Sequence, residues 1–68
     1  MICVCLERTL TKAGMTRYEL AKKTGISYPI IDKYYKNKVT RYDRNVLTRI
    51  CLVLHCDIAD ILEWTEET

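Results

Sequence analysis

One stretch of the sequence carries the signals of two short helices separated by a very tight turn. Thr16 and Glu19 have the spacing of a capping box, in which the first side chain caps a helix and the second bonds back to it. Gly25 supplies the left-handed backbone conformation that tight turns require, and Ser27 is a suitable N-cap for the following helix. The turn is therefore predicted to hold the two helices at a fixed angle. They span about residues 17–23 and 28–36.

The length of 68 residues leaves room for one small domain. A hydrophobic content of 49% is enough for a single core, although folding buries only about 60% of the surface of so short a chain. No apolar run approaches the roughly 18 residues of a membrane helix, and residues 1–6 are too short for the apolar part of a signal peptide. We therefore expect one soluble, cytoplasmic domain over residues 1–68, with no membrane partner.

The remaining segments are predicted to be helical too. Leu6 and Leu10 follow Ile2 at helical spacing, and Gly14 is placed to end that helix. Asp43 can cap a further helix, whose apolar side chains follow the i, i+3, i+4, i+7 pattern. No segment has the convincing alternation of a strand, so the fold class is all-α. The five short helices span about residues 2–13, 17–23, 28–36, 44–54 and 58–63.

Several apolar side chains of these helices are expected to face the core. In the helix over residues 28–36, Ile31, Tyr34 and Tyr35 share one face. The last predicted helix begins after Asp57 and turns three apolar side chains inward, while residues 66–68 are expected to fray. The three inward side chains are Ile58, Ile61 and Leu62.

The formal net charge is only +2, but it is unevenly distributed. Residues 12–49 contain ten Lys and Arg against three acidic residues, a net charge of +7. Residues 50–68 contain five acidic and no basic residues. The basic middle segment indicates an anionic partner for one face, and a solvated surface with uneven charge is an equal alternative on charge alone.

Four cysteines and one histidine raise the alternatives of disulfides, a metal site or ordinary packing. One residue separates Cys3 from Cys5 and four separate Cys51 from Cys56, which is not the usual spacing of structural zinc ligands. Without a secretion signal, stable disulfides are not expected. We interpret the cysteines as small buried hydrophobes with one or two exposed thiols, and His55 as the end of a helix. No metal or other cofactor is predicted.

Two short helices joined by a glycine-containing turn form a helix-turn-helix motif. The segment over residues 15–35 resembles the Cro and lambda-repressor-like (XRE-type) family of DNA-binding domains, which is found in prokaryotes and phages. The resemblance covers residues 2–64 and implies the lambda-repressor-like fold, with the helix-turn-helix at the second and third helices. The matching residues are Leu20, Ala21, Gly25, Ile26, Ser27, Ile31 and Tyr34, followed by Leu47, Ile50, Cys51, Leu54, Cys56, Asp57, Asp60, Ile61 and Leu62.

The resemblance also implies where DNA is bound, because the N-terminal part of the third helix enters the major groove in this family. Carried over by position, Lys33 donates to guanine, Asp32 accepts from cytosine N4, and Pro29 packs on a thymine methyl. Arg17, at the start of the second helix, is expected to contact the DNA backbone and to brace the third helix. The expected DNA-binding residues are Arg17, Ser27, Tyr28, Pro29, Asp32, Lys33, Lys36, Asn37, Lys38 and Arg41.

The resemblance and the basic segment together favour sequence-specific binding of double-stranded DNA by a small transcriptional regulator of the repressor type. The alternative is a protein-interaction module, such as an antitoxin or a phage or mobile-element modulator that kept the fold. A thiol or metal sensor is a third alternative, which would require a reactive cysteine or zinc. An enzyme is not expected, because the chain has one histidine, no glycine-rich phosphate loop and too little length to enclose a substrate.

Helix-turn-helix proteins bind as dimers to half-sites about 34 Å apart. Three apolar residues lie outside the predicted core and are candidates for a weak homodimer contact, although they could simply be exposed. They are Leu52, Val53 and Trp64.

Overall fold

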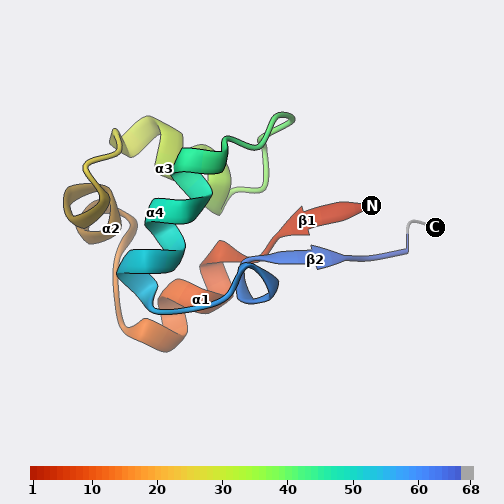
Figure 1. Cartoon of the computed structure of the whole chain (residues 1–68), viewed down its shortest axis with the longest axis horizontal. Coiled ribbons are helices and arrows are strands. Elements are labelled where there is room, and N and C mark those ends of the chain that lie inside the picture. The colour runs from red at the N-terminus through yellow and green to blue at the C-terminus, as the bar shows by residue number, and fades with distance from the viewer. Residues whose placement is uncertain (67–68) are drawn as a thin grey trace.

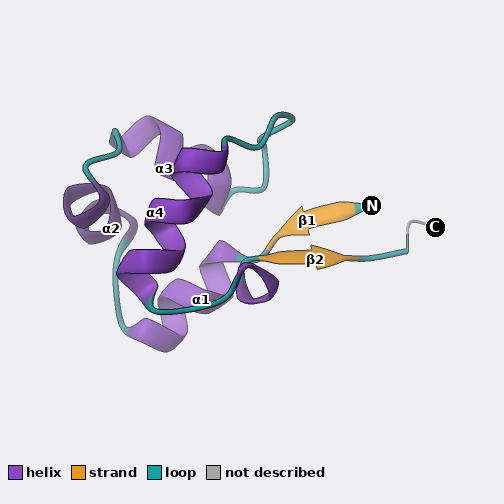
Figure 2. Cartoon of the chain, in the orientation of Figure 1, coloured by secondary structure: helices purple, strands orange, loops and turns teal. Residues whose placement is uncertain are grey.

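The computed structural model describes residues 1–66, in which four α-helices surround one core and a two-stranded antiparallel sheet projects from it (Figure 1). Figure 2 shows the helices as one body, with both strands at its edge. The expected fraying concerns residues 66–68, of which residues 67 and 68 lie outside the described residues. The elements are β1 (Ile2–Val4), α1 (Leu6–Ala13), α2 (Arg17–Thr24), α3 (Tyr28–Tyr35), α4 (Arg44–Leu54), the 3₁₀ helix η1 (Ile58–Asp60) and β2 (Leu62–Trp64).

The two helices of the central motif begin at the predicted residues and end within one residue of the predicted positions. The Thr16 hydroxyl accepts a hydrogen bond from the Glu19 N–H, and the Glu19 carboxylate accepts one from the Thr16 N–H, each at 3.1 Å. Gly14 ends α1 and Gly25 ends α2, with φ angles of 66° and 74° in the left-handed region. Ser27 precedes α3 as its N-cap, although its hydroxyl bonds no backbone N–H of that helix. The capping box and the tight turn are therefore confirmed.

α4 is the longest helix, at 11 residues, and has its own caps. The Asp43 carboxylate accepts hydrogen bonds from the N–H groups of Asn45 and Val46 at 2.8 and 3.1 Å. The Tyr34 hydroxyl accepts one from the Asp43 N–H at 2.9 Å, which ties α3 to the start of α4. His55 ends α4 in the left-handed conformation, so its predicted place at a helix C-terminus is confirmed. None of the helices within residues 1–66 has the length and apolar character needed to cross a membrane.

The core lies where the apolar faces of the four helices meet. Ile31 and Tyr34 are buried as predicted, and Tyr35 is half-buried at the edge of the core. Tyr34 packs edge-on against Tyr42, with ring centroids 6.5 Å apart. Full burial of an aliphatic or aromatic side chain contributes about 1.5–3 kcal/mol relative to its exposure. The largest fully buried side chains are Leu6, Leu10, Leu20, Ile31, Tyr34, Ile50 and Ile61.

The prediction of a helix from residue 2 is wrong, because the chain enters the fold as β1 and the first helix begins at Leu6. Val4 is buried, whereas Ile2 is 50% exposed and takes no part in a helical face. The backbone of β1 is bonded to β2, and the Val4 N–H donates to the Asn37 side chain at 2.9 Å. Partners far away in the sequence therefore outweigh the local helical spacing of Ile2 and Leu6.

The last predicted helix, over residues 58–63, is wrong beyond its first turn. Ile58–Asp60 form a single 3₁₀ turn, and Leu62–Trp64 form β2. Ile61 is buried as predicted and Leu62 is half-buried, but Ile58 is 46% exposed. The reason is again long-range pairing, because β2 satisfies its backbone groups on β1 instead of continuing the turn. The register pairs Ile2 with Trp64, Cys3 with Glu63, and Val4 with Leu62.

Candidate nucleic-acid interface

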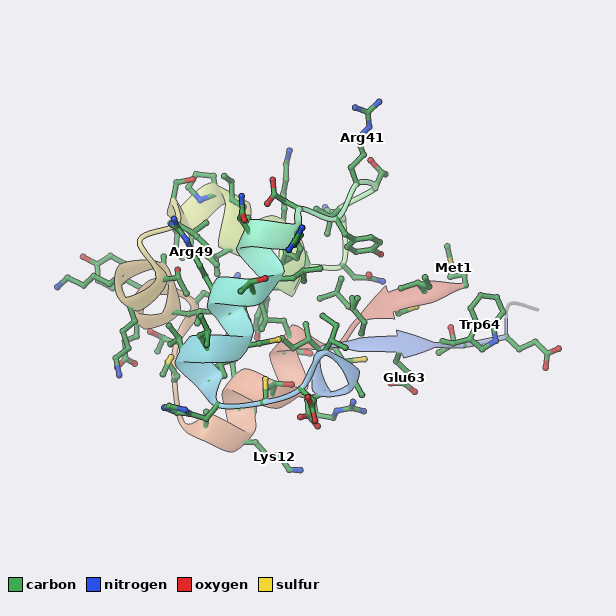
Figure 3. The ribbon with its side chains drawn as sticks, in the orientation of Figure 1. Met1, Lys12, Arg41, Arg49, Glu63 and Trp64 are labelled. Carbon is green, nitrogen blue, oxygen red and sulfur yellow. The ribbon has the colours of Figure 1, made fainter. Side chains whose placement is uncertain are left out.

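Hydrogen bonds within the motif and from α4 hold the turn between α2 and α3. The Thr24 hydroxyl donates to the Leu20 carbonyl at 2.7 Å and accepts a hydrogen bond from the Ile26 N–H at 3.3 Å. The Arg49 guanidinium, which points from α4 toward this turn (Figure 3), donates to the Thr24 carbonyl at 3.4 Å. A cation at this end of α2 also offsets the partial negative charge of the helix C-terminus. α4 therefore helps to fix the angle at which α3 is presented.

The outward face of α3 is exposed along its first two turns. Tyr28 is 40% exposed, and Pro29 and Lys33 lie exposed beside it. Pro29 is tolerated in the first turn, where its missing N–H has no intrahelical acceptor to lose. Lys33 makes no ion pair with any residue that the structure describes. The face thus offers apolar surface, a phenol and an ammonium group to a partner.

Ile30 also belongs to this face, although no motif in the sequence points to it. Its side chain is 42% exposed, whereas the neighbouring Ile31 is fully buried. At about 100° per residue, Ile30 falls between the inward Tyr34 and the outward Lys33. The helical period alone could therefore have placed Ile30 at the rim of the exposed face.

The Asp32 carboxylate of α3 forms ion pairs with two cationic side chains. Its Oδ1 accepts a hydrogen bond from the Arg17 guanidinium at 2.5 Å, and its Oδ2 lies 3.1 Å from the Nζ of Lys36, one turn further along α3. The bonds from Lys36 and Arg17 hold the pKa of Asp32 below its ordinary value, against the opposing effect of desolvation. In this structure Asp32 is therefore an ionised anchor for two cations, and both of its oxygens are occupied.

Arg17, the first residue of α2, contacts three side chains of α3. Besides its ion pair, the guanidinium lies over the Tyr35 ring, 4.3 Å from the centroid, and 6.0 Å from the centroid of the Tyr28 ring. The Tyr35 hydroxyl in turn donates to the Glu7 carboxylate of α1 at 3.2 Å. Cation–π contacts at exposed sites contribute about 0.5–1 kcal/mol. Arg17 therefore joins α2 to α3, and Tyr35 joins α3 to α1.

The basic loop after α3 extends the exposed face. Asn37 adopts the left-handed conformation, with φ 57°, and its Oδ1 accepts the hydrogen bond from the Val4 N–H. That bond leaves the amide NH₂ of Asn37 as a donor to a partner. Lys38 and Arg41 are exposed and form no ion pair within the described residues, and Figure 3 shows Arg41 projecting away from the body of the domain.

The structure divides the expected DNA-binding residues into two sets. The first is the ion-paired cluster of Arg17, Asp32 and Lys36, in which the Lys36 side chain keeps half of its surface exposed. The second set is exposed and carries no ion pair within the described part of the chain. It consists of Ser27, Tyr28, Pro29, Lys33, Asn37, Lys38 and Arg41.

The three candidate homodimer residues do not form one patch. Leu52 on α4 is 68% exposed and Trp64 on β2 is 74% exposed, whereas Val53 is half-buried and packs against the core. Leu52 lines an open groove together with Ile58. Trp64 instead pairs with Ile2 at the projecting end of the sheet. Leu52 and Trp64 are therefore two separate exposed apolar sites.

The four cysteines are half-buried and not joined in disulfides. The Cys5 thiol donates a hydrogen bond to the Glu63 carboxylate at 3.1 Å, and this bond together with burial raises the pKa of Cys5. Burial raises the pKa of Cys56 to about 11. Raised pKa values disfavour the thiolate, which is the form that reacts and binds metals. Among residues 1–66, no group of three His, Cys, Asp or Glu side chains could hold a metal ion.

An exposed second helix beside a basic loop, as seen here, is typical of helix-turn-helix DNA-binding domains. The profile of the family described as "Cro/C1-type HTH DNA-binding domain" matches residues 6–67, and the chain belongs to this family. Among solved structures it resembles a "putative DNA-binding protein" from Bacteroides fragilis, with a TM-score of 0.81 and 21% identity over 93% of this chain and 100% of that one. That likeness shows the fold. No curated protein matches the chain in a sequence comparison.

Proposed function

We propose that the chain binds double-stranded DNA sequence-specifically, as a small transcriptional regulator of the repressor type, with α3 in the major groove. The observation that carries this proposal is the exposed face of α3 beside the cations of the following loop, Lys38 and Arg41. Such a surface can supply both kinds of contact that a sequence-specific protein needs, those to base edges and those to phosphates. Membership of the Cro/C1-type family supports DNA as the partner.

Base contacts are proposed for the first two turns of α3. Lys33 can donate to O6 or N7 of guanine, both of which face the major groove. Pro29 and Ile30 have no side-chain polar group to offer, so they can pack against the methyl group of thymine. The Tyr28 hydroxyl can reach a base edge or a phosphate. A preferred site that combines guanine with thymine is expected.

Phosphate contacts are proposed for both ends of α3. Ser27 lies at the N-terminus of the helix, where N–H groups without an intrahelical acceptor and an uncommitted hydroxyl favour a phosphate. Beyond the helix, Lys38, Arg41 and the amide of Asn37 can meet a second stretch of the backbone. Contacts on both sides would fix the position of α3 in the groove.

The cluster of Arg17, Asp32 and Lys36 is proposed to act as one unit. Because both of its oxygens are occupied, Asp32 holds the two cations in place instead of accepting from cytosine N4. The Arg17 side chain is still 33% exposed and that of Lys36 50% exposed, so each can reach a phosphate from its position in the cluster. Asp32 would then contribute to DNA binding by positioning the positively charged side chains of Arg17 and Lys36.

We further propose that the chain acts as a weak homodimer on a two-fold-symmetric operator, with half-sites about 34 Å apart. The dimer would present one copy of α3 to each half-site. The proposed location is the cytoplasm of a prokaryote, where operators of this kind are accessible.

Selection of bound DNA from a random duplex pool, followed by gel shifts at low and high salt, tests the proposal. We expect enrichment of a two-fold-symmetric sequence and binding that weakens steeply with salt, because each neutralised phosphate releases counterions. Lys33→Gln should lose the preference for guanine. Lys12→Gln on α1 is the matched control, because Lys12 lies at the opposite side of the domain from Arg41 (Figure 3). Absence of salt-sensitive binding to any duplex would contradict the proposal and favour a protein-interaction module.

A further inference from the structure

Cys51 and Cys56 occupy the two positions that meet where the end of α4 is capped. His55 follows the helix in the left-handed conformation, and the Cys51 carbonyl accepts hydrogen bonds from the N–H groups of His55 and Cys56, the second at 3.1 Å. The bond from Cys56 is typical of a Schellman cap, in which the side chains at these two positions frequently contact each other. The cap therefore brings two thiols together, and we call Cys51 and Cys56 the cap pair.

The backbone of the cap permits a disulfide between these residues. The path from one Cα to the other through the hydrogen bond is bent, so standard bond lengths put the two Cα atoms less than about 7 Å apart. Disulfides join cysteines whose Cα atoms are about 4.4–6.8 Å apart. Both thiols are half-buried and line the same open groove as Leu52 and Ile58. A small reagent can therefore reach the cap pair from solvent.

Cys3 and Cys5 are closer together in the sequence but less well placed, and we call them the strand pair. Val4, between them, belongs to β1, and extended backbone sets alternate Cα atoms about 6.5–7 Å apart, at the upper limit for a disulfide. Each sulfur also has another partner. The Cys5 thiol donates to the Glu63 carboxylate at 3.1 Å, and Cys3 Sγ lies 3.4 Å from the Thr65 hydroxyl.

We propose that the cap pair is a site of reversible thiol oxidation, at which Cys51 and Cys56 form a disulfide by exchange with a small-molecule disulfide such as oxidised glutathione. One protein thiolate attacks the reagent, whose S–S bond breaks, and a mixed disulfide forms. The second protein thiolate then attacks the protein sulfur of the mixed disulfide and closes the bond between Cys51 and Cys56. The two electrons and two protons that the cysteines lose convert the reagent into two thiols.

The surroundings of Cys56 set how this disulfide behaves. Burial, followed by the neighbouring Cys51 thiol, raises the pKa of Cys56 to about 11. A small thiolate fraction slows the attack, but a thiol of high pKa is also a poor leaving group. The disulfide is therefore expected to form slowly and to persist until a reductant is in excess. The cap pair includes none of the residues proposed to contact DNA, so this site is additional to the proposed function.

Equilibration of the full chain with oxidised and reduced glutathione, followed by acid quenching and mass spectrometry, tests the proposal. Trypsin cleaves after Arg8 and Arg49, so the peptide of residues 1–8 holds the strand pair and that of residues 50–68 holds the cap pair. We expect the peptide of residues 50–68 to lose two hydrogen atoms without cross-linking to another peptide. Excess dithiothreitol should restore its mass.

Serine substitutions provide matched controls, since serine replaces a thiol with a hydroxyl of similar size. The double variant Cys3→Ser and Cys5→Ser should oxidise like the wild type, because it keeps the cap pair. Cys51→Ser leaves Cys56 without its partner and should stop at a mixed disulfide with glutathione. Thermal melts of the reduced variants establish that each one is folded.

The equilibrium constant for oxidation separates a site built by the fold from two thiols that are merely near in sequence. In the double variant, this constant should be about tenfold or more larger for the folded chain than for the chain in urea, because the cap holds the thiols together only when folded. The oxidised chain should accordingly melt at a higher temperature than the reduced chain. In the oxidised chain, the N–H of Cys56 should also exchange more slowly with solvent.

Equal oxidation constants in the folded and unfolded chain would overturn the proposal, as would a larger constant in the unfolded chain. Oxidation confined to the strand pair, disulfides between chains, or only mixed disulfides on residues 50–68 would overturn it as well. None of these measurements involves DNA, so their outcome leaves the proposed DNA binding to be decided by its own experiments.

Discussion

The Arg17 guanidinium of α2 and the Asp32 carboxylate of α3 lie 2.5 Å apart and join the two helices of the motif directly. Asp32 also holds Lys36, and Arg17 also covers the ring of Tyr35. An acidic residue on a surface proposed to meet DNA would repel phosphate if its charge were unbalanced. Here two cations within hydrogen-bond distance balance it, so the carboxylate can organise the positive charge of the surface.

Asp32→Asn is expected to lower the melting temperature slightly at neutral pH and to weaken DNA binding, because Arg17 and Lys36 lose their shared ionised partner. The effect on stability is small because solvent screens the pair. The folded-state pKa of Asp32 is lowered, so its contribution is present above the ordinary pKa of 3.8 and is lost as the pH falls through the folded-state pKa. Melts of both proteins across this range should show a constant difference near neutrality that vanishes in acid. A difference that grows in acid would contradict the ion pair.

Ile30 allows a test that separates base reading from phosphate attraction. If Ile30 packs on a thymine methyl, uracil in place of that thymine should weaken wild-type binding about fourfold, the equivalent of about 0.8 kcal/mol for one buried methylene-sized group. Ile30→Ala should lose the sensitivity to the methyl group and still bind the uracil-containing duplex about as well as the wild type. Gel shifts with the two duplexes at one salt concentration measure both effects. An equal penalty in both proteins would place the reading of the methyl group elsewhere on α3, with Pro29 as the remaining apolar candidate.

Lys38 and Arg41 are expected to contribute to the salt dependence of DNA binding. Each phosphate that a protein cation neutralises adds about 0.9 to the slope of log affinity against log salt. The double variant Lys38→Gln and Arg41→Gln should therefore reduce the slope by about 1.8 and weaken binding to all duplexes alike. Titrations at several salt concentrations give the slope, and Lys12→Gln should leave it unchanged. A double variant with the wild-type slope would assign the phosphate contacts to other residues.

The central motif could be predicted from the sequence because its signals act over a few residues. Thr16 and Glu19 bond each other's backbone, and Gly25 needs only its own left-handed φ, so residue type and spacing are sufficient. The strands could not be predicted in this way. Ile2 and Trp64 pair from opposite ends of the chain, and neither short segment alone indicates its partner. The Ile2 segment even fits a helical face, which its pairing with β2 overrides.

The candidate site likewise contains some features that the sequence predicts and others that it does not. The exposure of Tyr28 and Lys33 follows from the helical period once the buried face of α3 is known. The engagement of Asp32 does not, because it depends on how closely α2 approaches α3. The sequence alone could not distinguish an aspartate paired with Arg17 from one that accepts a hydrogen bond from a base.

Gly25→Val is expected to destabilise the domain by about 1–2 kcal/mol through backbone strain. The φ angle of 74° lies in the left-handed region, where a Cβ atom comes too close to its own backbone. A steric clash is not the cause, since the nearest atom to a new Cβ would be the Arg49 guanidinium at 3.9 Å. Asparagine tolerates the left-handed conformation, so Gly25→Asn should melt between the wild type and Gly25→Val. Equal melting temperatures for Gly25→Val and the wild type would contradict the role of the turn.

Asn37 is expected to stabilise the domain in two ways, which three substitutions separate. Asn37→Ala loses the acceptor for the Val4 N–H, at a cost of about 1–3 kcal/mol, and adds about 1–2 kcal/mol of left-handed strain. Asn37→Gly loses only the acceptor, whereas Asn37→Asp keeps both the acceptor and the tolerance of this backbone conformation. Denaturant unfolding should therefore rank the free energy of unfolding as highest for the wild type and Asn37→Asp, lower for Asn37→Gly and lowest for Asn37→Ala.

Hydrogen exchange at Val4 checks the same bond directly. In Asn37→Gly the Val4 N–H would lose its acceptor at the outer edge of β1 and should exchange faster with solvent, whereas in Asn37→Asp it should stay as slow as in the wild type. The Cys5 N–H, which donates to Ile61 across the sheet, is the internal reference and should change little in either variant. Slow exchange at Val4 in Asn37→Gly would mean that another group covers β1, because the side chain of Asn37 would then not account for its protection.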